Sequence, residues 1–107
     1  MMEITMSIKN QIIEAIKSGY KVELNYKGEG NRLVHPHALY RDKTSGTLKV
    51  DCYQEAGFST KPHEIPNWRQ FDINLITSLR LLNESFTVAS VYNPSSERYS
   101  NAIAMIK

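Results

Sequence analysis

The sequence is poor in the residue types that mark several protein classes. It has one cysteine, Cys52, so no disulfide can form within the chain, and we expect a reducing compartment, the cytoplasm. Four prolines and five glycines among 107 residues exclude collagen-like and low-complexity architectures. No apolar run approaches the ~20 residues that span a bilayer. Residues 1–7 contain an acid and do not have the pattern of a signal peptide.

Charges of the two signs nearly cancel. Thirteen lysines and arginines face eleven aspartates and glutamates, which gives a net charge of +2. Modules that coat DNA carry a larger and more clustered positive excess. Because aspartate is scarce and no nucleophile motif or paired-carboxylate pattern is present, we expect a protein that is not an enzyme and has no cofactor or metal site.

The length of 107 residues fits one domain, and a content of 41% hydrophobic and 22% charged residues is typical of a globular chain. Residues 7–18 repeat isoleucine every four positions, which predicts a helix with one apolar face. Ser7 is a suitable N-cap, and Gly19 suits a left-handed stop. We therefore expect a single domain over residues 1–107 that opens with one helix.

After the helix the period of the apolar residues changes from 3.6 to 2. Polar and apolar residues alternate over residues 20–26 and 48–53, which predicts two half-buried strands. Residues 32–40 are a third candidate strand. Pro36 predicts an edge position or a bulge there, because proline donates no hydrogen bond to a neighbouring strand.

Beyond residue 54 the period is less regular. Residues 55–67 lack a period and predict a long loop. Residues 68–82 change parity near Asn74-Leu75, which predicts two short strands or one bent strand. Residues 102–106 favour a short closing strand. One helix followed by five or six short strands predicts a mainly β fold, a small, bent antiparallel barrel.

The alternation also predicts which side chains are buried, since successive residues of a strand face opposite sides. Lys21, Glu23, Lys49 and Asp51 are expected outside. The expected core residues from the strands and from the end of the apolar region are Val22, Leu24, Val50, Cys52, Phe71, Ile73, Ile76, Leu79 and Phe86.

Several segments match a known family in order and spacing. They are Val22-Glu23-Leu24-Asn25-Tyr26, then Arg32 with His35-Pro36-His37-Ala38-Leu39, then Phe71-Asp72-Ile73-Asn74-Leu75-Ile76, and finally Phe86. With these segments the chain resembles the WYL domain of bacterial regulators. The Trp-Tyr-Leu triplet that names the family is Leu48-Lys49-Val50 here. Tyr53-Gln54, Gly57 and Trp68-Arg69 resemble the short stand-alone members of the family.

The resemblance implies an Sm/SH3-like barrel and a role in ligand sensing. Its implied ligands are a small nucleotide or single-stranded nucleic acid. Together with the chemistry of the side chains, the resemblance predicts seven ligand-binding residues, which are Arg32, His35, His37, Tyr53, Gln54, Trp68 and Arg69.

Most of these candidates also have an ordinary structural role. Arg32 is suited to grip a phosphate with two parallel hydrogen bonds, and equally to pair with Glu23 or Glu29. The two histidines become donors to an anion when protonated below pH about 6.5, or they are hydrogen-bonded structural residues. Aromatic rings such as those of Tyr53 and Trp68 stack on bases, and they also form the ordinary rim of a small barrel.

We therefore expect a non-enzymatic regulatory module that binds a nucleotide-like anion or single-stranded nucleic acid. Its groove is expected beside residues 32–37, under the loop at 55–67, with Trp68-Arg69 lining it. The alternative is a protein-interaction or homo-oligomerisation module that acts through an exposed strand edge or through the same loop.

Overall fold

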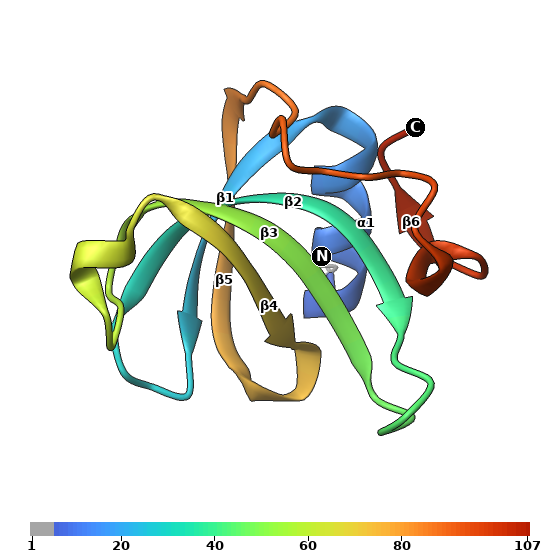
Figure 1. Cartoon of the computed structure of the whole chain (residues 1–107). Coiled ribbons are helices and arrows are strands. Elements are labelled where there is room, and N and C mark those ends of the chain that lie inside the picture. Colours follow the sequence, from blue (N-terminus) through green and yellow to red (C-terminus); the bar gives the residue numbers. More distant parts are fainter. Residues whose placement is uncertain (1–5) are drawn as a thin grey trace, which may run out of the picture.

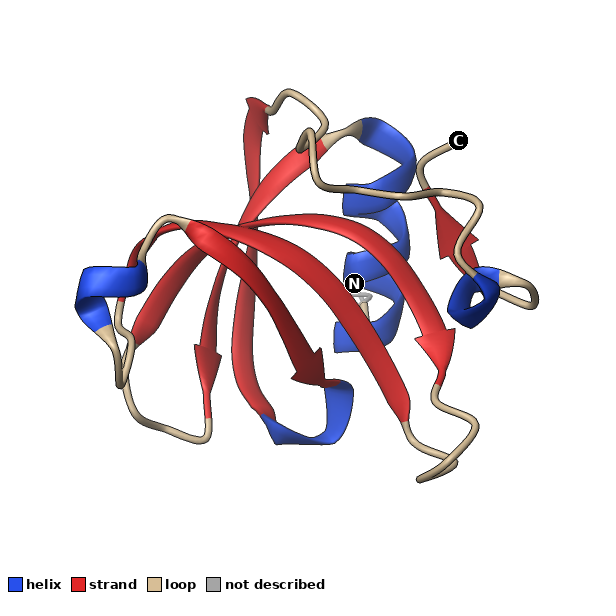
Figure 2. Cartoon of the chain, in the orientation of Figure 1, coloured by secondary structure: helices blue, strands red, loops and turns tan. Residues whose placement is uncertain are grey.

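The computed structural model describes residues 6–107 as a curved antiparallel sheet with one helix packed on its inner face (Figure 1). Three 3-10 turns separate or follow the strands (Figure 2). The elements are α1 (Ile8–Ser18), β1 (Tyr20–Tyr26), β2 (Asn31–Arg41), β3 (Leu48–Gly57), η1 (Pro62–Glu64), β4 (Asn67–Asp72), η2 (Ile73–Leu75), β5 (Ile76–Ser85), η3 (Glu97–Tyr99) and β6 (Ala104–Met105).

The helix begins and ends where the sequence predicts. The Ser7 side chain accepts a hydrogen bond from the Asn10 backbone N–H. Gly19 adopts a left-handed conformation with φ 70°, and its N–H donates to the carbonyl of Ala15. Among residues 6–107, α1 is the one helix longer than two turns, as expected.

The sheet has the strand order β4-β3-β2-β1-β5, and β6 pairs with the far end of β2. The register between β2 and β3 shifts between Pro36 and Ala38, so His37 is the extra residue of a bulge. The other neighbours of β2 leave this point free, since β1 pairs with residues 31–34 and β6 with residues 38–39. Pro36 therefore sits where its missing N–H is tolerated.

The predicted break near Asn74-Leu75 is confirmed. Strand β4 ends at Asp72, whose carboxylate accepts a hydrogen bond from the Asn74 N–H and opens η2. The chain then reverses into β5, which pairs with β1. The result is a mainly β, barrel-like fold with one N-terminal helix, in agreement with the sequence-based expectation.

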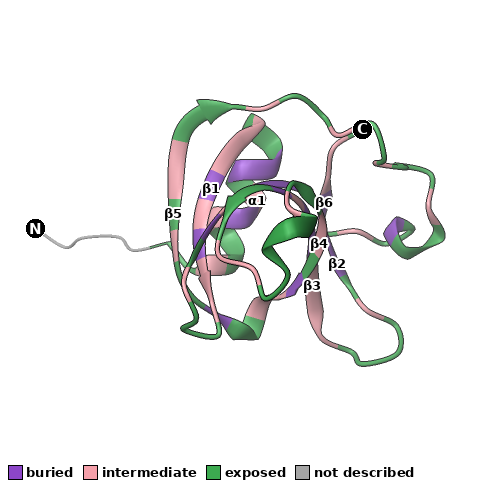
Figure 3. Cartoon of the chain, turned by 60° about the vertical axis from the view of Figure 1, so that its left-hand side comes forward, coloured by how far each residue is buried: buried purple, intermediate pink, exposed green. Residues whose placement is uncertain are grey.

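The core lies between α1 and the inner face of the sheet (Figure 3). Of the expected core residues, Ile73, Leu79 and Phe86 are only partly buried, because they lie at the sheet margin or beyond it. Buried core residues include Ile12, Ala15, Ile16, Val22, Leu24, Val34, Leu39, Val50, Cys52, Phe71, Ile76 and Ala104.

The prediction for Asp51 is wrong, because this carboxylate is fully buried. The chain after β5 returns across the outer face of the sheet and covers it. Asp51 accepts hydrogen bonds from the hydroxyl groups of Tyr40 at 2.9 Å and Tyr99 at 2.6 Å, and from Arg98 at 3.2 Å. Burial and the Asp51 charge raise the pKa of Tyr40 to about 12, so its hydroxyl remains a donor.

The loop at 55–67 is shorter than predicted, because β3 continues to Gly57 and β4 begins at Asn67. The connection is residues 58–66, and η1 occupies part of it. Of the helices described, none has the length and apolar content needed to cross a membrane.

We expect Tyr99→Phe to lower the free energy of unfolding by about 1–3 kcal/mol, because it removes one buried hydrogen bond to a charged acceptor and keeps the ring. Urea denaturation followed by circular dichroism measures the change. Tyr20→Phe is the matched control, since the Tyr20 hydroxyl makes no hydrogen bond within residues 6–107. Equal stability of the two variants would show that the Asp51 cluster does not hold the C-terminal segment.

Candidate functional site

The seven predicted ligand-binding residues divide between the two faces of the sheet. Arg32 is paired with Leu24, and Arg69 with Cys52; both partners are core residues, so both arginines point to the inner face. Gln54 is paired with the core residue Val34 and shares that face. The other four candidates, His35, His37, Tyr53 and Trp68, lie on the outer face.

Arg32 is the most enclosed charged side chain of the inner face, with 7% of its surface exposed. Three aromatic rings surround its guanidinium. The distance from the Arg32 Cζ atom to the ring centroid is 5.5 Å for Tyr26 and 5.4 Å for both Phe58 and Phe71. These are cation–π distances, so the rings partly compensate the charge for lost water.

No carboxylate of the described residues forms an ion pair with Arg32. Its one side-chain hydrogen bond goes to the neutral Gln54 Oε1 at 3.4 Å, and its Nε has no partner. Burial lowers the pKa of Arg32; the Glu29 charge opposes this shift, and the Arg69 charge adds to it. Of the two predicted ion-pair partners, Glu23 pairs with Arg80 instead.

Phe58 is the third aromatic side chain around Arg32, and it was not among the residues predicted from the sequence. Its N–H donates to the Asn31 carbonyl, and its own carbonyl accepts from Gln54 Nε2 at 2.8 Å. Its side chain lies against Gly30, and a Cβ at position 30 would come within 2.9 Å of the Phe58 Cβ atom. The signal in the sequence was the pair of glycines, Gly30 and Gly57, which permit this close approach.

Arg69 brings a second positive charge to the inner face. Its guanidinium forms a 3.6 Å ion pair with Glu64 of η1. Both side chains are partly exposed, so this pair adds little to stability. Arg32, Gln54 and Arg69 therefore lie on one face, whereas Trp68 points away from it.

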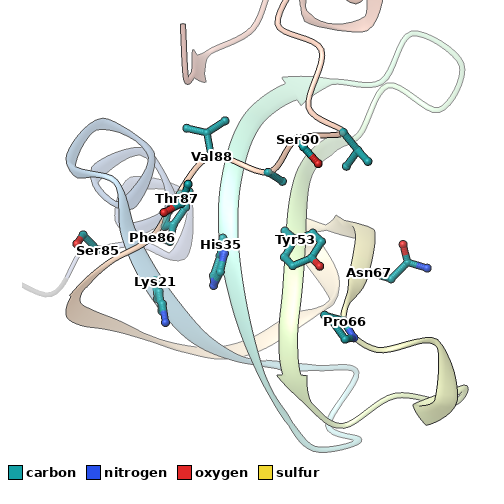
Figure 4. A pocket seen from close by; sticks show the side chains of 12 residues that line it. Lys21, His35, Tyr53, Pro66, Asn67, Ser85, Phe86, Thr87, Val88 and Ser90 are labelled. Atoms are coloured by element: carbon teal, nitrogen blue, oxygen red, sulfur yellow. The ribbon is translucent and has the colours of Figure 1, made fainter.

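On the outer face His35 lies between Lys21 and Tyr53 (Figure 4). Its Nε2 is 2.9 Å from the Glu55 carboxylate, and its ring stacks on Phe86 with centroids 4.8 Å apart. Lys21 is already paired, with Glu55 at 2.8 Å and Glu84 at 3.0 Å. The positive charge on this face is thus balanced by carboxylates.

His37 is fully buried, and both of its ring nitrogens have partners. Its Nδ1 donates to the His35 carbonyl at 2.7 Å, because a carbonyl can only accept. Its Nε2 accepts from the Ala89 N–H at 2.9 Å. This arrangement requires the neutral ring, and burial lowers the pKa of His37, with a smaller opposing effect of its bond to the His35 backbone.

The segment after β5 forms the roof of a cavity of about 620 Å³ over the outer face (Figure 4). His35 and Tyr53 are the predicted site residues that line it. Trp68 lies farther along the face, with its ring 5.0 Å from His37 and 6.1 Å from Tyr92. The aromatic surface of Trp68 is therefore partly covered by the chain itself.

The prediction of one groove shared by Arg32, the histidines and Trp68-Arg69 is wrong. Arg32 and His35 are three positions apart along β2, and Trp68 and Arg69 are neighbours, so the members of each pair face opposite sides. His37 cannot become a second donor to an anion at Arg32 on protonation. The covering segment over the outer face is residues 85–91, not the loop at 55–67.

The fold is similar to that of proteasome accessory factor B/C (PafBC) of Arthrobacter aurescens, with a TM-score of 0.63 and 16% sequence identity. The similarity covers 86% of this chain and 14% of the PafBC chain, so this chain spans a small part of that protein. At this level of identity the similarity shows a shared fold. No protein-family model matches the sequence, and comparison with curated proteins gives no match.

The tautomer of His37 leads to an expected dependence of stability on pH. The neutral ring is favoured in the folded state, so stability is complete above the unfolded pKa of about 6.5 and falls as the pH drops toward the lowered folded pKa. Between these two values the loss approaches about 1.4 kcal/mol per pH unit.

Urea denaturation from pH 7.5 to pH 4.5 measures this loss in the wild type and in His37→Gln, whose amide does not titrate. We expect a flatter profile in His37→Gln. The control is His63→Gln, which changes an exposed histidine and should keep the wild-type profile. A wild-type profile in His37→Gln would contradict the assignment.

Proposed function

We propose that the protein is a non-enzymatic regulatory sensing module that binds a nucleotide-like anionic ligand at Arg32. The observation that carries this proposal is the state of Arg32, a buried guanidinium that, within residues 6–107, has no carboxylate partner and an unpaired Nε. The one cysteine is a buried free thiol, which fits our proposal that the module acts in the reducing cytoplasm.

A buried charge that lacks a counter-charge is unfavourable, and an anion is the group that relieves it. A guanidinium binds phosphate through two parallel hydrogen bonds, which makes phosphate the favoured anion. The rings of Tyr26 and Phe58 lie beside it, and aromatic rings are the side chains on which a base stacks. The Gln54 amide is already used, since its Oε1 accepts from Arg32 and its Nε2 donates to two backbone carbonyls. The proposed site thus combines a guanidinium for the phosphate with aromatic rings for the base.

The number of cations near Arg32 favours a small ligand or a short single strand over duplex DNA. Arg32 and Arg69 are the two arginines of this face, and Glu64 and Glu29 reduce the net charge. Binding should therefore weaken only gently with salt, since few counterions are released.

We expect Arg32→Met to weaken binding roughly 10–100-fold, because charge-assisted hydrogen bonds contribute about 1.5–3 kcal/mol. Fluorescence anisotropy measures it with two probes, a labelled mononucleotide and a labelled single-stranded oligonucleotide, each at low and moderate salt. Arg80→Met is the control, since Arg80 is exposed on β5 and pairs with Glu23.

The same variant separates a binding role of Arg32 from a structural one. Methionine retains the packing against the three rings and removes an unpaired buried charge, so the free energy of unfolding should stay equal or increase. A large loss of stability with unchanged binding would assign Arg32 to the core and end the proposal. Binding of the oligonucleotide alone would replace the small nucleotide by single-stranded nucleic acid.

One observation favours the alternative of a protein-interaction module. Strand β5 pairs with β1 on one side, and its other edge has no partner among the described residues. Such an edge can pair with a strand of a second chain. Sedimentation equilibrium across a range of concentrations tests self-association. If the protein stays a monomer at every concentration, pairing of this edge with a second copy of the chain is excluded.

A further inference from the structure

A second cluster of cations lies at the opposite end of β2 from Arg32. Two cavities of about 190 Å³ and 400 Å³ share four lining residues, Arg41, Asp42, Lys43 and Arg98. We call the two together the hairpin cleft, since it lies beside the turn between β2 and β3. Arg32 and Arg41 are separated by up to roughly 30 Å along an extended strand, so this cleft is separate from the Arg32 site.

The carboxylate of the hairpin cleft, that of Asp42, is already hydrogen-bonded within the turn. The Asp42 carboxylate accepts hydrogen bonds from the Ser45 N–H at 3.0 Å and from the Ser45 hydroxyl at 2.7 Å. These bonds lower the pKa of Asp42 and close the turn. Asp42 forms no ion pair with Arg41, Lys43 or Arg98.

The three cations keep donors available. Arg41 uses one terminal nitrogen for the Gly46 carbonyl, at 2.6 Å. Lys43 is exposed, and within residues 6–107 its ammonium group makes neither an ion pair nor a hydrogen bond. Arg98 uses one nitrogen for Asp51, and half of its side chain remains exposed.

Arg98 differs from a flexible surface arginine because Asp51 fixes it. That carboxylate is fully buried and is held by the hydroxyl groups of Tyr40 and Tyr99. The remaining nitrogens of the guanidinium are therefore positioned before any ligand arrives, which lowers the entropy lost on binding. Gln70, which donates to the Tyr40 hydroxyl, adds a polar group to the smaller cavity.

We propose that the hairpin cleft binds the phosphate group of a small phosphate ester. Two guanidinium groups and one ammonium group suit a phosphate dianion, since each guanidinium offers a planar pair of donors. The larger cavity has the volume of a small-ligand site, and Ile103 and Gly46 line it with apolar surface for the organic part of the ester.

The experiment is a titration of the whole chain, ¹⁵N-labelled, followed by ¹H–¹⁵N correlation spectra at constant ionic strength and pH 7.5. The probes are inorganic phosphate and phenyl phosphate, with chloride as the reference anion. We expect saturable shifts at the amides of residues 41–46 and 98–103. Phenyl phosphate should bind more tightly than inorganic phosphate, because its ring can contact Ile103.

Two substitutions identify the site. Arg98→Gln and Lys43→Gln should each weaken binding about tenfold, the effect of losing about one charge-assisted contact. Among the described residues the Lys43 ammonium group makes no ion pair or hydrogen bond whose loss would unfold the protein, so Lys43→Gln remains informative even where Arg98→Gln is unstable. Arg80→Gln is the matched control with an exposed arginine on β5 and should bind as the wild type does.

The proposal is overturned if chloride produces the same shifts, if no shift saturates, or if Lys43→Gln and Arg80→Gln bind equally well. Arg32→Met tests the two sites independently, because it should leave the shifts at the hairpin cleft unchanged. Loss of those shifts in Arg32→Met would instead assign phosphate binding to the inner face.

Discussion

The placement of the candidate residues depends on β2, which among the strands of residues 6–107 is the one that pairs with three others, β1, β3 and β6. Alternation along this strand sends Arg32 to the inner face and His35 to the outer face. The bulge at His37 then changes the parity, so that Leu39 returns to the core while Ala38 and Tyr40 face outward. Without the extra residue, the second half of β2 would present Ala38 and Tyr40 to α1 in place of Leu39, since a shift of one residue exchanges the two faces.

The outer face is closed by the chain after β5, which pairs with β2 through β6 and forms hydrogen bonds with side chains of the sheet at two further points. Asp51 holds the hydroxyl of Tyr99 and the guanidinium of Arg98, and His37 accepts from the N–H of Ala89. Both acceptors are fully buried under the segment, where water has no access, so these hydrogen bonds are needed to satisfy them. The cavity over the outer face therefore exists because of these attachments, and its shape depends on the neutral form of His37.

The sequence predicts the local elements well because each depends on near neighbours. The caps of α1, the alternation of β1 and the break before Leu75 are all interactions within a few residues. The placement of Asp51 is different, because its partner Tyr99 is 48 residues away and alternation alone assigns it to the solvent side. Phe58 was missed for the same reason, since its contact with Arg32 needs the close approach of two turns. The prediction of a single groove, in contrast, could have been avoided, because residues three positions apart on one strand, such as Arg32 and His35, face opposite sides.

The two cationic sites differ in how their charge is compensated, and this difference has a thermodynamic consequence. Arg98 is joined to a buried carboxylate, so this guanidinium is positioned and its charge is compensated before binding, and an anion there adds stability in proportion to its affinity. Within residues 6–107 Arg32 is surrounded by rings and an amide and has no carboxylate partner, so the folded protein retains an unfavourable buried charge. The proposed anion at Arg32 would remove that penalty, and the gain would appear in its affinity. For this reason, we expect an anion at Arg32 to bind more tightly, and to stabilise the barrel more at the same concentration, than one at the hairpin cleft.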